Sequence, residues 1–166
     1  MSKLQFTVSE AAFLAEIKVT TLKVWRQRKV VLVEDADEDN RGRWSRFSYG
    51  DVLQAATIQC LTNQGMAPNT ASMIANSGRH VFPDIFSDFR GSDAPPAYVV
   101  AFSSYKLLEG DQSKQFAFAN SFEELHQVLS DRSKSPLLEH FSVTDFSAIS
   151  AKVTFRYFDM TNGKKP

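Results

Sequence analysis

Two capping-box sequences constrain the first half of the chain most strongly. In this motif a Ser or Thr side chain accepts the amide three residues on, and the acidic side chain at that position accepts an amide in return. Thr7-Val8-Ser9-Glu10 and Ser48-Tyr49-Gly50-Asp51 both fit this pattern. Apolar residues follow each of them. The sequence therefore predicts one helix beginning near residue 7 and another beginning near residue 48.

A second helix is predicted from about Val19 to Arg28, after a tight connection. At helical spacing Val19, Leu22 and part of Trp25 share an inward face. The outward side chains are Thr20, Lys23, Arg26 and Gln27. This outward face has no acid and can donate hydrogen bonds to phosphates and to the acceptor-rich edges of bases. A solvated helix face with no binding role has a similar composition. The surrounding sequence must therefore decide between a solvated face and a DNA-binding face.

The segment between this helix and Ser48 is predicted to form a β-hairpin. Val30–Val33 is a β-type run, residues 34–39 are mostly acidic, and residues 41–47 bring back basic and aromatic side chains. Two extended stretches about a polar loop make a wing. A central helix over residues 52–61 and a short helix from Pro68, stopping at residues 76–78, complete the predicted order.

This order of elements resembles the MerR-type winged helix-turn-helix. Five motifs in the family's order carry the resemblance, which covers about residues 6–78. The family's opening Thr-x-x-Glu-x-Ala is matched by Thr7, Glu10 and Ala12. Its Thr-Leu-Arg-x-Tyr is matched by Thr21-Leu22-Lys23-Val24-Trp25, and its aromatic-Ser and Asp-Val pairs by Phe47-Ser48 and Asp51-Val52. Its glycine followed by a short capped helix is matched from Gly65 onward.

The chain departs from the family in three places. Lys29-Val30 stands where the family has glycine and leucine, and Ser45 stands where it has a wing arginine. Family regulators continue into one long coiled-coil helix that dimerises. Here Pro83 and Pro95-Pro96 interrupt that stretch, because proline does not continue a helix.

The resemblance implies a sequence-specific double-stranded DNA-binding protein, a bacterial transcriptional regulator acting in the cytoplasm on the nucleoid. By analogy it also implies contact with RNA polymerase. The residues expected at DNA are Thr20, Thr21, Lys23, Trp25, Arg26, Arg43, Trp44 and Arg46. Two alternatives stay open: an excisionase-like factor that bends the DNA of a phage or mobile element, and a protein-interaction adaptor on a winged-helix scaffold.

The predicted fold class is α+β, with the winged helix-turn-helix at residues 1–78 followed by a small α/β module. Residues 79–96 are predicted to be a linker with a short helix, and residues 97–166 the module, for dimerisation or sensing. Strands are expected near residues 97–102, 115–118 and 137–143, with a helix capped at Ser121. Residues 145–158 fit either a helix capped at Thr144 or a strand, and helix is favoured. A homodimer is expected through Phe146, Ile149, Val153 and Tyr157, although these aromatics could instead enclose an apolar ligand.

Composition argues against several other classes. The 19 Lys and Arg balance the 19 Asp and Glu, and residues 1–50 hold nine basic against seven acidic side chains. One cysteine excludes an internal disulfide. No apolar run approaches the ~18–20 residues that cross a bilayer. The three histidines are isolated, and no phosphate loop or nucleophile triad stands out. The sequence therefore predicts no enzyme activity, no metal and no cofactor.

Overall fold

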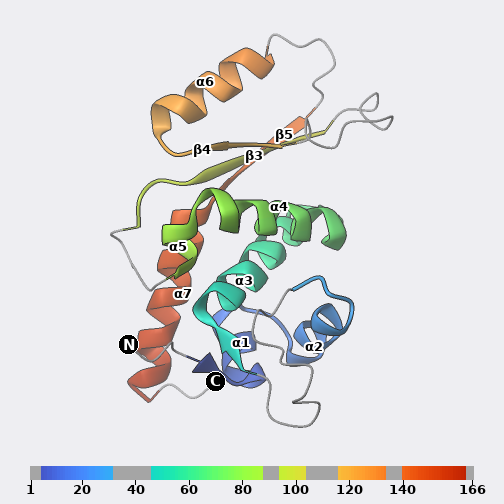
Figure 1. Cartoon of the computed structure of the whole chain (residues 1–166), viewed down its shortest axis with the longest axis vertical. Coiled ribbons are helices and arrows are strands. Elements are labelled where there is room, and N and C mark those ends of the chain that lie inside the picture. The colour runs from blue at the N-terminus through green and yellow to red at the C-terminus, as the bar shows by residue number, and fades with distance from the viewer. Residues whose placement is uncertain (1–4, 32–45, 88–93, 104–115, 134–139, 164–166) are drawn as a thin grey trace.

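The computed structural model describes residues 5–31, 46–87, 94–103, 116–133 and 140–163. A group of helices from the first half of the chain forms one end of the molecule, and a small sheet with its own helix forms the other (Figure 1). The last helix, α7 (Phe146–Thr161), runs from the sheet alongside the helical part. None of the described helices is long and apolar enough to span a membrane.

The predicted helix-turn-helix is present as α1 (Val8–Leu14) and α2 (Val19–Gln27). The other described elements of the first half of the chain are β1 (Gln5–Phe6), β2 (Phe47–Ser48), α3 (Tyr49–Asn63), α4 (Pro68–Val81) and α5 (Pro83–Ser87). Both capping boxes are confirmed. The Thr7 hydroxyl accepts the Glu10 amide at 3.3 Å, and the Glu10 carboxylate accepts the Thr7 amide at 2.7 Å. Such caps satisfy amides that the first helical turn leaves without a partner.

The predicted pairing of the wing is only partly described. Residues 32–45 lie outside the described residues, and Val30 and Val31 form a buried bend instead of the predicted strand. At the other end, Phe47–Ser48 pairs with the N-terminal Gln5–Phe6 in antiparallel register. A bend replaces the strand because both valines pack into the core, where α2 ends.

The C-terminal module contains a three-stranded antiparallel sheet, as the fold class predicted. Its elements are β3 (Tyr98–Ser103), β4 (Phe116–Ala119), α6 (Phe122–Ser133) and β5 (His140–Asp145), in the sheet order β4-β3-β5. Alternation along β3 separates its two faces. Val99 and Ala101 join the core shared with the helices, whereas Val100 and Phe102 pack toward Leu125 of α6. The sheet is therefore covered on both sides.

Helix is the observed state of residues 146–161, which resolves the ambiguity in the sequence. Its cap is Asp145 and not the predicted Thr144: the Asp145 carboxylate accepts the amides of Ser147 and Ala148, at 2.9 and 3.1 Å. Thr144 is instead buried in β5, where its hydroxyl donates to Gln64 at 3.2 Å. The chain thus passes from sheet to helix without a loop.

α7 shares a hydrophobic core with the helix-turn-helix. Phe146 has no exposed surface, and its ring lies 5.8 Å from each of Phe82 and Phe86 and 6.3 Å from Phe118. A Cβ atom at Gly78 would come within 2.7 Å of the Phe146 ring, so this close approach requires glycine. Helix α4 continues to Val81, beyond the stop predicted at residues 76–78. The division at residues 78 and 96 remains a prediction.

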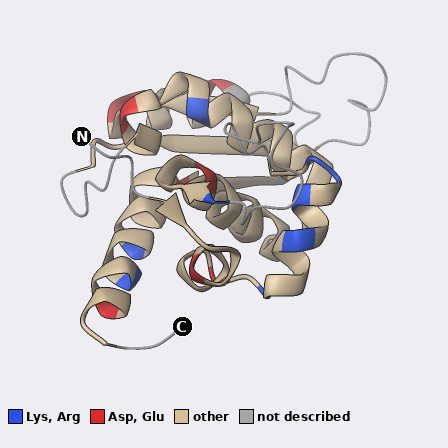
Figure 2. Ribbon diagram, turned by 60° about the horizontal axis from the view of Figure 1, so that its bottom comes forward, with Lys and Arg blue, Asp and Glu red and all other residues tan. Residues whose placement is uncertain are grey.

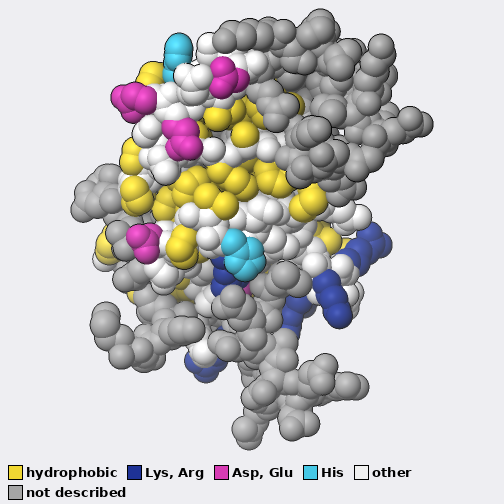
Figure 3. Space-filling model, turned by 45° about the horizontal axis from the view of Figure 1, so that its top comes forward, with side chains coloured by type: hydrophobic (Ala, Val, Ile, Leu, Met, Phe, Trp, Pro, Cys, Tyr) yellow, Lys and Arg dark blue, Asp and Glu magenta, His cyan; other side chains and the backbone are white. Residues whose placement is uncertain are grey.

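Charged and apolar side chains occupy different parts of the surface. Lys and Arg gather on α2, at the right of Figure 2, and on the segment just after it. In the view of Figure 3, most of the visible Asp and Glu side chains lie above a band of hydrophobic side chains, whereas the Lys and Arg side chains lie below it. Among the described residues, exposed cations therefore gather on and just after α2, and exposed acids on α6.

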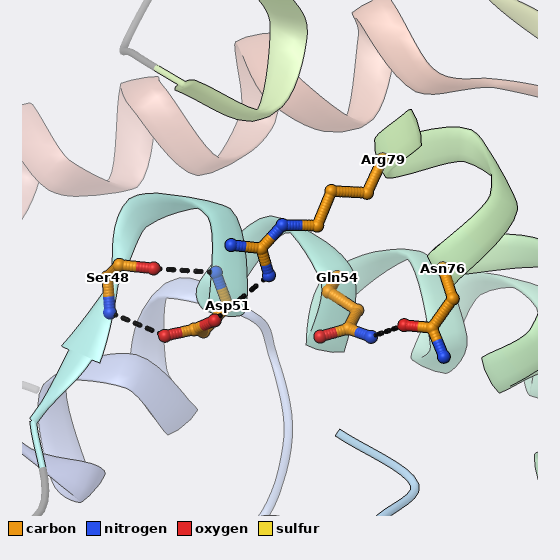
Figure 4. Close-up of polar contacts among 5 residues, drawn as sticks. All are labelled: Ser48, Asp51, Gln54, Asn76 and Arg79. Atoms are coloured by element: carbon orange, nitrogen blue, oxygen red, sulfur yellow. Dashed lines mark hydrogen bonds and ion pairs between the residues drawn. The ribbon is translucent and has the colours of Figure 1, made fainter. Parts of the chain in front are cut away.

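A polar lock joins α3 to α4 (Figure 4). Asp51 caps α3 by accepting the Ser48 amide at 2.8 Å, and its other oxygen accepts Arg79 of α4 at 3.1 Å. Gln54, with no exposed surface, donates to Asn76 of α4. Asp51 is buried, so removing Arg79 would leave its carboxylate without a cationic partner, which costs several kcal/mol. These contacts therefore stabilise the packing of α4 against α3.

Lys29 ends α2 in a conformation that favours glycine. Its φ is 55°, in the left-handed region. The Val30 amide donates to the Trp25 carbonyl at 2.8 Å and the Lys29 amide to the Arg26 carbonyl at 3.0 Å, which is a Schellman motif. Trp25 and Val30 are both buried, as the motif's apolar contact requires. Lys29 therefore has the left-handed backbone conformation that suits the glycine found at this position in the family.

We therefore predict that Lys29→Gly stabilises the protein. A non-glycine residue in this region is strained by about 1 kcal/mol, so the glycine variant should exceed Lys29→Ala by roughly 0.5–1 kcal/mol in unfolding free energy. Urea denaturation of both variants measures the difference. Lys29→Ala is the matched control, because it removes the same side chain and keeps the strain. An alanine variant as stable as the glycine variant would contradict this account of the turn.

Candidate nucleic-acid interface

The two faces of α2 separate as its spacing predicts. Leu22 is fully buried and Trp25 is 8% exposed, so they anchor the helix. Thr20, Lys23 and Gln27 are exposed, and Thr21 and Arg26 are partly buried. Arg28 and Lys29 extend the exposed basic surface beyond the end of the helix. The solvent-exposed face of α2 is therefore mainly polar and cationic.

A surface pocket of about 750 Å³ lies where α1, α2 and β2 meet. Its lining residues come from three separate parts of the chain: Thr7, Val8 and Ser9; Lys23, Arg26 and Gln27; and Arg46. Hydroxyl, ammonium, guanidinium and amide groups thus converge on one concave surface. All four groups can donate hydrogen bonds to a phosphate oxygen.

Two of the three cations that line the pocket make contacts with neighbouring side chains. Arg46 donates to the Gln5 side chain over 3.5 Å, which is a weak contact. The Arg26 guanidinium carbon lies 5.8 Å from the centre of the Phe47 ring, within cation–π range. The nearby acid, Glu10, uses its carboxylate to cap α1. The described lining of the pocket thus supplies three cations and no acid, a composition that suits an anion.

The structure places the predicted DNA-contacting residues unequally. Lys23, Arg26 and Arg46 come together at the pocket, and Thr20 is exposed on the same helix. Trp25 is a core residue that the sequence offered as either core or phosphate donor. Arg43 and Trp44 lie outside the described residues. Thr7 and Ser9 line the pocket although the sequence analysis did not select them; their position at the start of a capped helix was the available signal.

The predicted dimer residues face the interior. Phe146 has no exposed surface and Val153 only 1%, so they cannot form a surface for a second copy. Ile149 and Tyr157 are partly buried against the same core, and the Tyr157 ring packs 6.0 Å from Phe6. Burial rules out this role for Phe146 and Val153, because helical spacing reveals an apolar face but not what covers it. For Ile149 and Tyr157 the interface stays a prediction. The exposed aromatics of α7 are Phe155 and Phe158.

Catalytic and metal chemistry has little support in the described part of the chain. There, no three His, Cys, Asp or Glu side chains come together as metal ligands would. The Cys60 thiol is partly buried. Burial raises its pKa, against the lowering effect of the Lys152 charge, so it is a poor nucleophile near neutral pH. The basic pocket is therefore the candidate functional site among the described residues.

Comparison with known proteins supports a DNA-binding role. The family model described as "MerR HTH family regulatory protein" matches residues 6–77. This range begins at β1, ends within α4, and contains every residue of the basic pocket. None of the curated proteins matches the chain significantly. The family is one of DNA-binding regulators and not of enzymes. Residues 6–77 therefore form a MerR-family helix-turn-helix domain, the DNA-binding part of a transcriptional regulator.

Proposed function

We propose that α2 enters the major groove of duplex DNA while the basic pocket holds a backbone phosphate beside it. Thr20 and Lys23 then face base edges or the nearest phosphates, with Thr21 behind them. Arg26 and Arg46 hold the backbone, and the wing residues Arg43 and Trp44 extend this grip. Trp25 supports the helix from inside. Transcriptional control is the consequence, with RNA polymerase as a second partner by analogy with the family, in the cytoplasm where bacterial DNA lies.

One observation carries this proposal. Three cations from two distant segments, Lys23 and Arg26 on α2 and Arg46 before β2, line a single pocket. Folding brings them together although the chain has no net charge. Mutual repulsion makes such an arrangement unfavourable unless an anion neutralises it. A phosphate chain running past α2 supplies that charge.

The first test is the salt dependence of binding. Affinity for duplex DNA should fall steeply with salt, because phosphate contacts release counterions. Arg46→Ala should weaken binding to all sequences alike and reduce the slope of log K against log salt by roughly 1. Arg46→Lys, the matched control, keeps the charge and should keep most of the slope. If the wild-type protein shows no salt-sensitive binding to any genomic fragment, the proposal fails. That result would favour the alternative of a protein-interaction adaptor.

The second test separates base contacts from phosphate contacts. Thr20→Ala and Lys23→Ala should each change the site recovered by selection from random duplex DNA. A well-made base contact is worth roughly 1–3 kcal/mol of discrimination. Arg46→Ala serves as the control, since phosphates carry no sequence information and its selected site should equal that of the wild type. If the wild type and both α2 variants select the same DNA site, Thr20 and Lys23 of α2 do not contact the bases.

We also propose that the protein is a homodimer, joined through the face of α7 that carries Phe155 and Phe158. These side chains are 66% and 57% exposed and lie three residues apart, on one helical face. A single small module rarely reaches operator-level affinity alone. Two copies related by a two-fold axis would read half-sites about 34 Å apart, or a multiple of that distance. Exposed aromatics of this kind are typical of the core of an interface.

Light scattering tests the dimer. The full chain should have the mass of two copies at micromolar concentration, and the double variant Phe155→Ala/Phe158→Ala should have the mass of one. Phe122→Ala on α6 is the matched control, because Phe122 is 69% exposed but lies on another element. A monomeric wild-type protein rejects the dimer. A dimeric double variant moves the interface to another surface.

A further inference from the structure

The turn between α1 and α2 is held in a strained conformation. Glu16, at its centre, has a φ of 57°, which non-glycine residues rarely adopt. The turn is a second Schellman motif: the Ile17 amide donates to the Ala12 carbonyl at 2.9 Å, and the Glu16 amide to the Phe13 carbonyl at 3.2 Å. Glu16 is thus the left-handed residue of the turn that leads from α1 into α2.

The Arg156 guanidinium of α7 makes three contacts with the end of α1 and with this turn. Its Nη1 donates to the Phe13 carbonyl at 2.8 Å, and its Nη2 binds the Glu16 carboxylate. Its guanidinium carbon lies 5.5 Å from the centre of the Phe13 ring. Lys152, one turn earlier on α7, binds the other carboxylate oxygen of Glu16. One side chain from near the end of the chain thus joins the end of α1 to the turn.

These contacts favour the observed conformation for clear physical reasons. A cation at a helix C-terminus interacts favourably with the helix dipole, and the Phe13 carbonyl accepts Arg156 in addition to the Glu16 amide. A planar guanidinium can bind the carbonyl and the carboxylate at once, which an ammonium group cannot do in the same geometry. The Arg156 side chain is 26% exposed, compared with 62% for Lys152, so its interactions are less screened by water.

The helix that carries Arg156 is itself anchored through its N-terminal part. It begins directly after β5, and its first residue is the fully buried Phe146. In its middle, the Ser150 hydroxyl shares a buried hydrogen bond of 2.7 Å with the Tyr49 hydroxyl of α3. α7 lies alongside the helical part from the sheet down toward the N-terminal end (Figure 1). Arg156 therefore presents a fixed group to the turn.

We propose that Arg156 is a positioning residue for DNA binding: through Phe13 and Glu16 it fixes the α1–α2 turn, and so the orientation of the basic face of α2. This inference rests on the function proposed above. Arg156 itself does not touch the DNA. The C-terminal module then controls DNA affinity without contributing a DNA contact, because α7 is the element that links β5 to the turn.

Simple electrostatics makes the opposite prediction for Glu16. Removing an acid from a DNA-binding domain reduces repulsion of the phosphates and should tighten binding. If the Glu16 carboxylate instead holds the turn through Arg156, removing it should weaken binding. The sign of the change in Glu16→Gln thus separates positioning from bulk charge. Arg156→Ala alone cannot do so, because both explanations predict weaker binding.

The experiment measures the affinity of the full chain for one selected DNA duplex. The variants are Glu16→Gln, Arg156→Ala, Arg156→Lys, Lys152→Ala and the double variant Glu16→Gln/Arg156→Ala. Measurements are made well below the unfolding temperature of the least stable variant, with folding checked by circular dichroism. Hydrogen exchange of the Glu16 and Ile17 amides in the free protein gives a second readout that needs no DNA.

Glu16→Gln and Arg156→Ala should each weaken binding roughly fivefold or more, as for other couplings between sites. The double variant should be little worse than either single one, since both remove the same interaction. Lys152→Ala, which removes an equal charge from the same helix, should have a smaller effect, and Arg156→Lys should fall between Arg156→Ala and the wild type. The turn amides should exchange faster in Arg156→Ala, while the sheet amides should not change.

Glu16→Gln binding as tightly as the wild type, or more tightly, overturns this inference while the proposed function stands. Additive effects in the double variant also overturn it. A wild-type protein that binds no DNA overturns the proposed function instead. The positioning role is then judged by hydrogen exchange, and turn amides that exchange at the wild-type rate in Arg156→Ala reject it.

Discussion

The burial of Phe146 is the contact on which the arrangement of the two halves depends. Its ring packs among Phe82, Phe86 and Phe118, and only a glycine at position 78 lets α4 come so close. A buried phenylalanine is worth about 3–5 kcal/mol against truncation, a large share of a domain's marginal stability. This one contact joins the α4–α5 corner, strand β4 and the start of α7. The sheet is therefore fixed relative to the DNA-binding helices rather than tethered to them.

Helix starts could be predicted from the sequence because capping chemistry is local. Thr7 with Glu10, and Ser48 with Asp51, form their hydrogen bonds within four residues, so nothing distant decides the outcome. The end of α2 was also predicted to within a residue, but the left-handed turn residues after α1 and α2 could not be predicted. A Schellman turn is usually marked by glycine, but Glu16 and Lys29 occupy its left-handed position here. At Glu16 the compensating contacts come from α7, some 140 residues away in sequence.

Long-range pairing explains what else the sequence could not show. The strand Phe47–Ser48 pairs with Gln5–Phe6, and a two-residue ladder has no periodicity to detect. The apolar face of α7 was recognised, but its spacing fits an internal core and a dimer interface equally well. The bulk charge was similarly uninformative. The pocket depends on bringing Arg46 beside Lys23 and Arg26, which is a property of the fold and not of the composition.

The separation of charge has a consequence for how the protein meets DNA. The exposed acids Glu123, Glu124 and Asp131 lie on α6, at the far end from the basic pocket. Under the proposed function, the phosphates of DNA attract the cations of α2 and repel the acids of α6, which favours an approach through α2. The sheet and α6 lie at the other end of the molecule from α2 (Figure 1). α7 connects that sheet to the turn that precedes α2, through the contacts of Arg156.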